Sequence, residues 1–328
     1  MQTRREFIVT ASQTAAVLAG LPLVKRAIAN DRVRKPLDII DCHTHFYDPS
    51  RAEGVPWPDE QSSLYRTVLP KHLRALPMPQ PLGGTVIVEA SNWIEDNQWL
   101  LDLAKDDPFI VGIVGHLTPG NETFREHLKR FAANELFRGI RVSQQLIAKV
   151  DEQLLADLKL LVDHDLELDV NGGPETPQIV ASLAARLPEL RIVVNHLGNV
   201  RIDGKWPPQD WTDGMRQAAR HKQVYCKISA LVEGAARDDK PAPKEVDFYR
   251  PVLDIAWEAF GEDRLIYGSN WPVSERAADY AVLQQIVLDY FADRGEVAVE
   301  KFFSLNAKQA YKWLDREGRT SRSDGQEK

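Results

Sequence analysis

Eight short β-rich runs, separated by helical segments, restrict the fold of this sequence more than any other feature. Each run is followed by polar residues or by Gly and Pro, and then by a longer stretch with helical spacing of apolar residues. The runs are residues 37–43, 85–90, 109–116, 137–143, 166–172, 191–198, 224–229 and 264–269. Strands that alternate with helices in this way are typical of a parallel sheet.

Closing the eight strands into a barrel explains their number and leaves no unpaired edge. An open, doubly wound sheet is the alternative, but no G-x-G-x-x-G motif follows any run. We therefore predict an α/β fold, a single (β/α)8 TIM barrel within residues 30–315. Long connections after the first strand (46–83) and the sixth (198–211) are typical of binding loops, and residues 316–328 are predicted to be a disordered tail.

Apolar spacing in two of the intervening segments predicts helices. In residues 151–164 and in residues 245–260, the apolar side chains recur every three or four positions and so share one face. These stripes would pack against the sheet, as the helices of a barrel do.

The first 29 residues have the layout of an export signal. Arg4 and Arg5 precede an apolar stretch, residues 15–24, and small residues at Ala27 and Ala29 suit a signal peptidase. The apolar stretch is shorter than the roughly 20 residues that span a bilayer. We predict a twin-arginine-type signal peptide at 1–29, a periplasmic or otherwise exported location, and no stable membrane span after its removal. An uncleaved amphipathic arm is the alternative.

Charge and cysteine content limit the possible partners. A net charge of −7, with no basic stripe beyond the N-terminus, disfavours nucleic acid and leaves a small molecule as the expected partner. Cys42 and Cys226 lie on strands two apart, about 10 Å, which exceeds disulfide reach. Both cysteines are expected to face outward. The sequence leaves the oligomeric state open.

Polar side chains occur at the end of every predicted strand, where a barrel of this kind carries its chemistry. They are His43, His45, Glu89, His116, Arg141, Asn171, His196, Lys227 and Asn270. His43 and His45 have the i, i+2 spacing that places both rings on one face of a strand. With His196 they would form a site for one divalent cation, zinc first, with Glu89 as a further ligand. Without metal, the same rings would hydrogen-bond a substrate carbonyl; a purely structural role is the third possibility.

Tryptophans in the loops at the strand ends suit a carbohydrate-like ligand. Trp57, Trp206 and Trp271 lie in or near these loops, where their flat faces would stack on a sugar ring. Loop packing is the alternative role.

Several motifs together resemble one family. "DCHTHFYDP" (41–49), "VPWPDEQSSLYRTVLPKHL" (55–73), "RFAANELFRGIRVS" (130–143), "VVNHLGN" (193–199), "VYCKISALV" (224–232) and "RLIYGSNWPVS" (264–274) are similar to the amidohydrolase-related (amidohydrolase 2) family of metal-dependent and metal-independent TIM-barrel hydrolases. The nearest resemblance is to its sugar-lactonase and 2-pyrone-4,6-dicarboxylate lactonase branch. It implies lactone hydrolysis, with His43, His45 and His196 around the reacting carbonyl. Arg141, Lys227 and Asn171 would bind the substrate.

The sequence departs from that family at Asn270, where the strand-8 motif usually carries Asp. An amide cannot serve as a general base near neutral pH. Glu89 or His196 would then take over, a metal would activate water, or the site would bind without turnover. General-base loss costs a factor of about 10² to 10⁴, so slow residual activity also fits.

We predict a hydrolase that opens a small lactone, a sugar-acid lactone or related cyclic ester. A decarboxylase or an amidohydrolase of the same superfamily is one alternative. A non-catalytic protein that binds a sugar or lactone is the other, and Asn270 favours it. The identity of the substrate and the presence of a metal remain open at the level of sequence.

Overall fold

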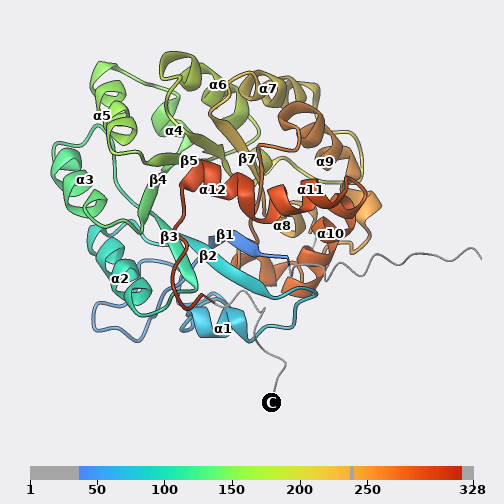
Figure 1. Ribbon diagram of the computed structural model, residues 1–328, viewed down its shortest axis with the longest axis horizontal. Helices are drawn as coiled ribbons and strands as arrows, with labels where there is room; N and C mark the ends of the chain where they lie inside the picture. The colour runs from blue at the N-terminus through green and yellow to red at the C-terminus, as the bar shows by residue number, and fades with distance from the viewer. Residues whose placement is uncertain (1–36, 237–239, 320–328) are drawn as a thin grey trace, which may run out of the picture. The chain divides into compact units, whose positions relative to one another are not determined.

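The computed structural model describes residues 37–236 and 240–319, and its strands form one parallel sheet in chain order (Figure 1). The predicted barrel and all eight predicted runs are confirmed. The strands are β1 (Ile39–Thr44), β2 (Leu82–Val88), β3 (Ile110–Gly115), β4 (Phe137–Ser143), β5 (Glu167–Asn171), β6 (Ile192–Val194), β7 (Val224–Ile228) and β8 (Leu265–Tyr267).

Backbone hydrogen bonds beyond the end of β8 close the barrel against β1. The amide of Asn270 donates to the carbonyl of His43 at 2.8 Å, and the amide of His45 donates to the carbonyl of Trp271 at 2.9 Å. The loop after β8 is therefore fastened beside the two histidines that end β1.

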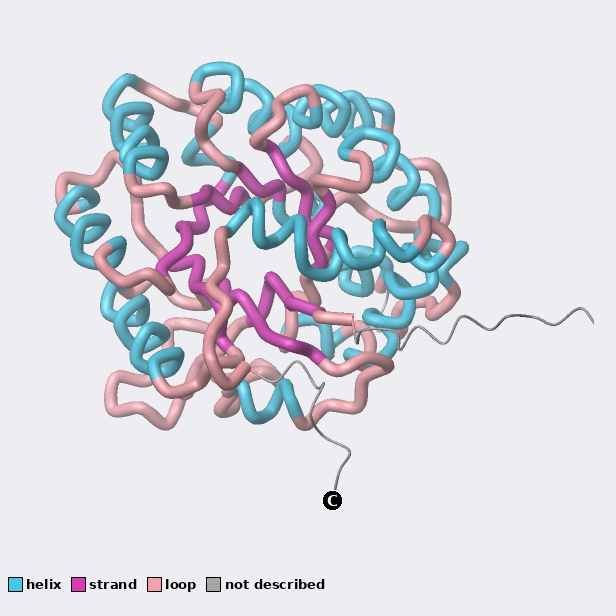
Figure 2. The backbone as a smooth tube through the Cα atoms, viewed as in Figure 1, coloured by secondary structure: helices cyan, strands magenta, loops and turns pink. Residues whose placement is uncertain are grey.

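Helices surround the sheet, as the cyan ring around the magenta strands in Figure 2 shows. The longer ones are α2 (Ile94–Lys105), α3 (Phe124–Ala132), α5 (Glu152–Asp163), α6 (Thr176–Arg186), α7 (Gln209–Ala219), α9 (Val246–Phe260) and α10 (Tyr280–Ala292). The two helices predicted from apolar spacing are α5 and α9. Asp151 caps α5 because its side chain accepts a hydrogen bond from the amide of Leu154 at 2.8 Å.

The two long connections are present as predicted. The first runs from β1 to β2 and contains α1 (Pro70–Arg74), while the second runs from β6 to α7 and begins with the turn η1 (Asn195–Asn199). β6 ends at Val194, earlier than the predicted 198. His196 and Leu197 both have a φ of 54°, which is incompatible with extended strand.

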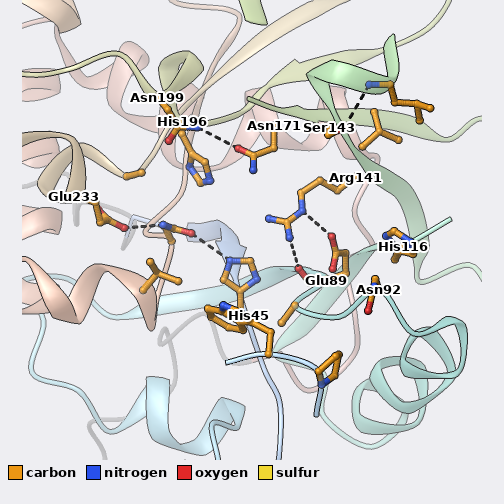
Figure 3. A pocket seen from close by; sticks show the side chains of 18 of the residues that line it. His45, Glu89, Asn92, His116, Arg141, Ser143, Asn171, His196, Asn199 and Glu233 are labelled. Carbon is orange, nitrogen blue, oxygen red and sulfur yellow. Dashed lines mark hydrogen bonds and ion pairs between the residues drawn. The ribbon is translucent and has the colours of Figure 1, made fainter. Parts of the chain in front are cut away.

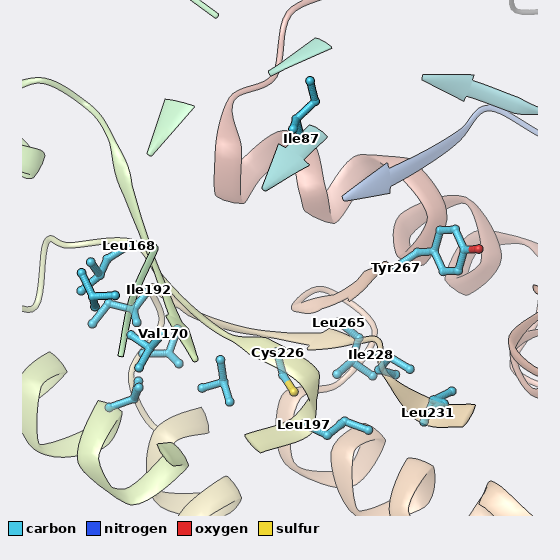
Figure 4. Close-up of a cluster of buried hydrophobic side chains, with 14 of the residues drawn as sticks. Ile87, Leu168, Val170, Ile192, Leu197, Cys226, Ile228, Leu231, Leu265 and Tyr267 are labelled. Carbon is cyan, nitrogen blue, oxygen red and sulfur yellow. The ribbon is translucent and has the colours of Figure 1, made fainter. Parts of the chain in front are cut away.

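Apolar side chains pack in two layers on either side of the strands. The outer layer lies between strands and helices and includes Leu168, Val170, Ile192, Cys226 and Leu265 (Figure 4). The inner layer fills the barrel with Ile40, Cys42, Val86, Val111, Val193 and Ile266, and packs on side chains of α12 (Asn306–Tyr311). Figure 1 shows α12 lying across the barrel. This helix covers the end at which the strands begin, so only the opposite end is left for a site.

An irregularity near the end of β1 shifts the alternation of its side chains. Asp41 pairs with Thr85 and Thr44 pairs with Ile87, so β1 uses one residue more than β2 over this interval. Such a bulge re-aims the side chains beside it. Cys42 belongs to the inner layer although it was expected to face outward, whereas Cys226 does face outward. Both cysteines are free and buried, in agreement with the predicted lack of a disulfide.

Ordered contacts continue past the predicted barrel boundary at residue 315. The Arg316 guanidinium donates to the carbonyls of Ala104, Asp107 and Ile110, and Arg319 donates to Asp38. The predicted signal peptide at 1–29 and residues 320–328 of the predicted tail lie outside the described residues. Within the described ranges, no helix is long and apolar enough to cross a membrane.

Candidate active site

A cavity of about 850 Å³ opens at the carboxyl ends of the strands (Figure 3). Each of its walls comes from a different strand end or the loop that follows. Polar or charged side chains dominate the lining: His45, Glu89, Asn92, His116, Thr118, Arg141, Ser143, Asn171, His196, Asn199, Glu233, Asn270 and Arg276. A cavity with this lining suits a small ligand that carries many oxygen atoms.

Three histidine rings meet at and beneath the base of the cavity: His45 and His196 line it, whereas His43 is fully buried behind them. The ring of His43 lies 4.9 Å from that of His45 and 4.3 Å from that of His196, measured between ring centroids. The bulge in β1 supplies the first two rings and the η1 turn after β6 supplies the third. The predicted three-histidine cluster is therefore brought together in space.

Backbone strain concentrates around the cavity. Of the described non-glycine residues with positive φ, four line the cavity: His196, Asn199, Ala230 and Asn270, with φ between 48° and 60°. Such conformations cost of order 1 kcal/mol or more and tend to gather at functional sites. Here they aim side chains that a regular strand or helix would point elsewhere.

Each histidine is anchored through Nδ1. His45 Nδ1 lies 2.9 Å from the carbonyl oxygen of Val88, and His196 Nδ1 lies 2.7 Å from the hydroxyl of Ser229. His43 Nδ1 lies 3.2 Å from Nζ of Lys227. The Nε2 atoms of His43 and His196 are thus left for the cluster, while Nε2 of His45 faces Asn270 Oδ1 at 3.2 Å. Nε2 of His43 is buried with no hydrogen-bond partner in the described structure.

Burial keeps all three rings neutral. Loss of solvent lowers the pKa of His43 and His196 well below the usual value, and the nearby Lys227 cation adds to the effect. The pKa of His45 falls to about 3, again through burial first and the Arg141 cation second. Each ring therefore offers one N–H donor and one acceptor nitrogen near neutral pH.

Lys227 decides which nitrogen of His43 carries the proton. Its buried ammonium donates to Oδ2 of Asp169 at 2.7 Å, and it also faces His43 Nδ1. An ammonium group has no acceptor, so His43 Nδ1 must accept and the proton of the neutral ring resides on Nε2. His43 consequently presents an N–H to the centre of the cluster.

This arrangement does not fit the predicted divalent cation. A metal needs the lone pair of Nε2, which the tautomer of His43 replaces with a proton. No group of three or more His, Cys, Asp or Glu suited to hold a metal ion occurs among residues 37–236 and 240–319. Glu89, the predicted carboxylate ligand, is instead engaged by Arg141. The geometry of the described residues therefore supports no catalytic step through a metal.

Arg141 and Glu89 form a pair on the cavity wall. Arg141 Nε donates to Glu89 Oε1 at 2.8 Å, and its Nη2 donates to the Glu89 carbonyl at 2.9 Å (Figure 3). Two contacts of this kind fix the plane of the guanidinium. Arg141 can therefore present its remaining N–H groups to a ligand in one orientation.

Asn270 connects His45 to a carboxylate that sequence reasoning missed. Its Nδ2 donates to Glu233 Oε1 at 2.7 Å, and its Oδ1 lies 3.2 Å from His45 Nε2. Burial raises the pKa of Glu233 to about 7. Glu233 belongs to the short helix α8 (Leu231–Ala235), which directly follows β7. The signal in the sequence was a lone carboxylate in the loop after the "CKIS" strand.

Three of the residues predicted to bind substrate do not line the cavity. Lys227 is fully buried beneath His43, and Trp271 is 1% exposed with its indole N–H donated to Glu275. Trp206 is 67% exposed and lies away from the cavity wall. Trp57 does line the cavity, with its ring in a T-shaped arrangement with that of His45, and Asn171 lines it at the end of β5.

Comparison with known proteins places the chain in a family. A sequence profile described as Amidohydrolase matches residues 40–313. The chain belongs to the amidohydrolase family. This confirms the resemblance drawn from the motifs.

Two relatives and one solved structure illustrate what the chain is similar to. An L-fucono-1,5-lactonase from Burkholderia ambifaria is 30% identical over 247 residues, which is 74% of this chain and 82% of that protein. An amidohydrolase from Burkholderia multivorans, solved with bound zinc, is 26% identical with a TM-score of 0.73, covering 84% of this chain and all of the other. A Pseudomonas putida structure named for 2-pyrone-4,6-dicarboxylic acid hydrolysis is 20% identical, with a TM-score of 0.64 over 84% of this chain and 98% of the other, and shows the shared fold.

Proposed function

We propose that this protein is a hydrolase that opens a sugar-acid 1,5-lactone, a six-membered cyclic ester. The buried, unpartnered Nε2–H of His43 inside a cluster of neutral histidines carries the proposal. A donor held in this way has no partner until an oxygen atom arrives, which is how an enzyme stabilises a developing oxyanion. The polar lining of the cavity and the similarity to an L-fucono-1,5-lactonase support the substrate class.

The reaction follows from these positions. In the proposed reaction the lactone carbonyl oxygen enters the space between the three rings, below the cavity lining, and accepts a hydrogen bond from the buried His43 Nε2. That hydrogen bond grows stronger as negative charge develops on the oxygen. Arg141, held in one plane by Glu89, orients the hydroxyl groups of the substrate, and Trp57 covers one face of the ring. Water attacks the polarised carbonyl carbon, and the ester bond within the ring breaks to release a hydroxy acid.

A non-catalytic binding protein is the second candidate. One observation favours it: Asn270, at the strand-8 position, is an amide that cannot take a proton from water. On this view the same donors would hold an intact lactone. The two candidates differ in turnover and not in affinity.

The deciding experiment follows proton release while the purified protein is mixed with a panel of five- and six-membered sugar lactones that includes L-fucono-1,5-lactone. We expect rates well above spontaneous hydrolysis for at least one six-membered lactone. Stoichiometric binding in calorimetry without acceleration of any lactone would establish the binding protein instead.

Metal removal forms a separate arm of the same experiment. We expect chelator-treated protein to keep its rate and to contain less than one divalent cation per chain by elemental analysis. If chelator abolished the rate and zinc restored it, His43 Nε2 would have to be free of its proton and able to bind the metal beside Lys227. The zinc prediction from sequence would then be right.

A further inference from the structure

The proposed hydrolysis needs a group that takes a proton from water, and the histidines are poorly suited to that task. Their pKa values are lowered by burial, that of His45 to about 3, so they hold a proton weakly near neutral pH. A general base works best when its pKa lies near the working pH. The carboxylates of the cavity are therefore the next groups to consider.

Two carboxylates, Glu89 and Glu233, are among the described residues that line the cavity. Glu89 is held by Nε of Arg141 at 2.8 Å, and a proton added there would break that ion pair. Among residues 37–236 and 240–319, no cationic side chain forms an ion pair with Glu233. Its Oε1 accepts from Asn270, while its buried Oε2 has no hydrogen-bond partner in the described structure.

We propose that Glu233 is the general base of this enzyme, displaced from the end of β8 to helix α8 and positioned by Asn270. This inference rests on the proposed lactone hydrolysis and names the residue that makes it possible. Asn270 at the strand-8 position then has a function of its own, because its amide N–H holds the carboxylate of the adjacent helix against the cavity.

The hydrogen bonds around Asn270 can rearrange to accommodate a proton on Glu233. His45 Nδ1 donates to the Val88 carbonyl, so its neutral Nε2 is an acceptor that faces another acceptor, Asn270 Oδ1. When Glu233 gains a proton, the side-chain amide of Asn270 can flip. Its Nδ2 then donates to His45 Nε2, and its Oδ1 accepts from the new Glu233 O–H. All three groups are then satisfied, which stabilises the protonated base.

The proton balance of the step is complete. As the water oxygen bonds to the carbonyl carbon, one water proton passes to Glu233 and the carbonyl electron pair moves to oxygen next to His43. When the intermediate collapses, the bond from that carbon to the ring oxygen breaks. The ring oxygen keeps the electron pair and takes the proton back from Glu233, which yields the free hydroxyl of the product.

Within the part of the chain that the structure describes, few charged groups perturb the titration of Glu233. Arg276 from the turn after β8 lowers its pKa, while burial raises it more strongly, to about 7. Tyr249 of α9 lies close enough for Glu233 to raise the pKa of its phenol, and Asn270 donates to Oε1. The active form is the carboxylate, so activity should fall as the pH drops below about 7.

The test measures kcat and KM of Glu233→Gln between pH 5 and 9, with L-fucono-1,5-lactone as the probe. We expect kcat to fall by a factor of about 10² to 10⁴ with little change in KM. We also expect the acidic limb of the pH–rate profile, the fall of kcat below about pH 7, to disappear. Glu89→Gln should keep that limb while KM rises. Glu258→Gln, on the exposed surface of α9, serves as the matched control and should behave like the wild type.

Two further variants guard against a Glu233→Gln protein that folds poorly. Arg276→Gln leaves Glu233 in place and should move the acidic limb to higher pH, because it removes the cation that lowers the pKa of Glu233. Glu233→Ala should regain part of its rate in the presence of formate, a small base that fits the vacated space.

The outcomes separate the two proposals. Wild-type protein that accelerates no lactone would overturn the proposed function itself. Wild-type turnover together with a Glu233→Gln variant that keeps its kcat, or that keeps the acidic limb, would overturn the assignment of Glu233 alone. An unshifted limb in Arg276→Gln would also count against Glu233.

Discussion

Trp57 and Trp206 show how two residues with the same predicted role separate once their surroundings are known. Both lie in long loops at the strand ends, and both were predicted to stack on a sugar ring. Trp57 lines the cavity with its ring centroid 6.0 Å from that of His45, whereas Trp206 is 67% exposed and absent from the cavity wall. Only Trp57 is placed to cover a ligand.

Replacing each tryptophan by alanine tests this difference. Trp57→Ala should raise KM for the lactone about 2- to 10-fold, the ratio that corresponds to a ring contact worth about 0.5–1.5 kcal/mol. Trp206→Ala should leave KM unchanged. Steady-state kinetics of both variants measure this difference. An equal rise in KM for the two would show that both tryptophans contact the ligand, as the sequence predicted.

At the scale of elements, a buried ion pair joins β5 to β7 beneath the site. Lys227 and Asp169 are both fully buried, and Tyr311 of α12 donates to the second oxygen of Asp169 at 2.9 Å. The same lysine sets the tautomer of His43 on β1. Three elements far apart in the sequence thus hold one histidine in its working state.

Removing one partner of this pair should be much worse than removing both. Lys227→Met leaves the Asp169 carboxylate buried without its cation, and we expect the free energy of unfolding to fall by about 3–5 kcal/mol. In the double variant Lys227→Met/Asp169→Leu, most of the lost stability should be regained, because no unpaired charge remains. Urea unfolding measures both values, and equal instability of the two variants would refute the explanation.

On the scale of the whole molecule, the chain combines an acidic catalytic barrel with an N-terminus predicted to be an export signal. Arg4, Arg5 and the apolar stretch at 15–24 carry that prediction. On this basis we propose that the protein is exported from the cytoplasm.

Fractionation of a bacterium that expresses the full chain tests the location. We expect the protein in the periplasmic fraction with a new N-terminus after Ala29, and the variant Arg4→Lys/Arg5→Lys retained in the cytoplasm at full length. The exported protein should keep lactone-opening activity because the barrel begins beyond the signal. Unprocessed wild-type protein in the cytoplasm would favour the amphipathic-arm alternative.

The sequence by itself determined the barrel, because its eight apolar runs, each followed by a helical segment, identify the residues that must be buried. Burial of apolar side chains dominates the free energy of folding. It also determined that His43, His45, His196 and Arg141 meet, since the carboxyl ends of parallel strands gather at one rim. Pattern could not determine that a bulge in β1 lets the adjacent residues Cys42 and His43 both face the barrel interior, or that Lys227 lies below the site. Only the tertiary structure placed Glu233 against Asn270, because the approach of α8 to the loop after β8 depends on packing and on strained φ angles that no local spacing encodes.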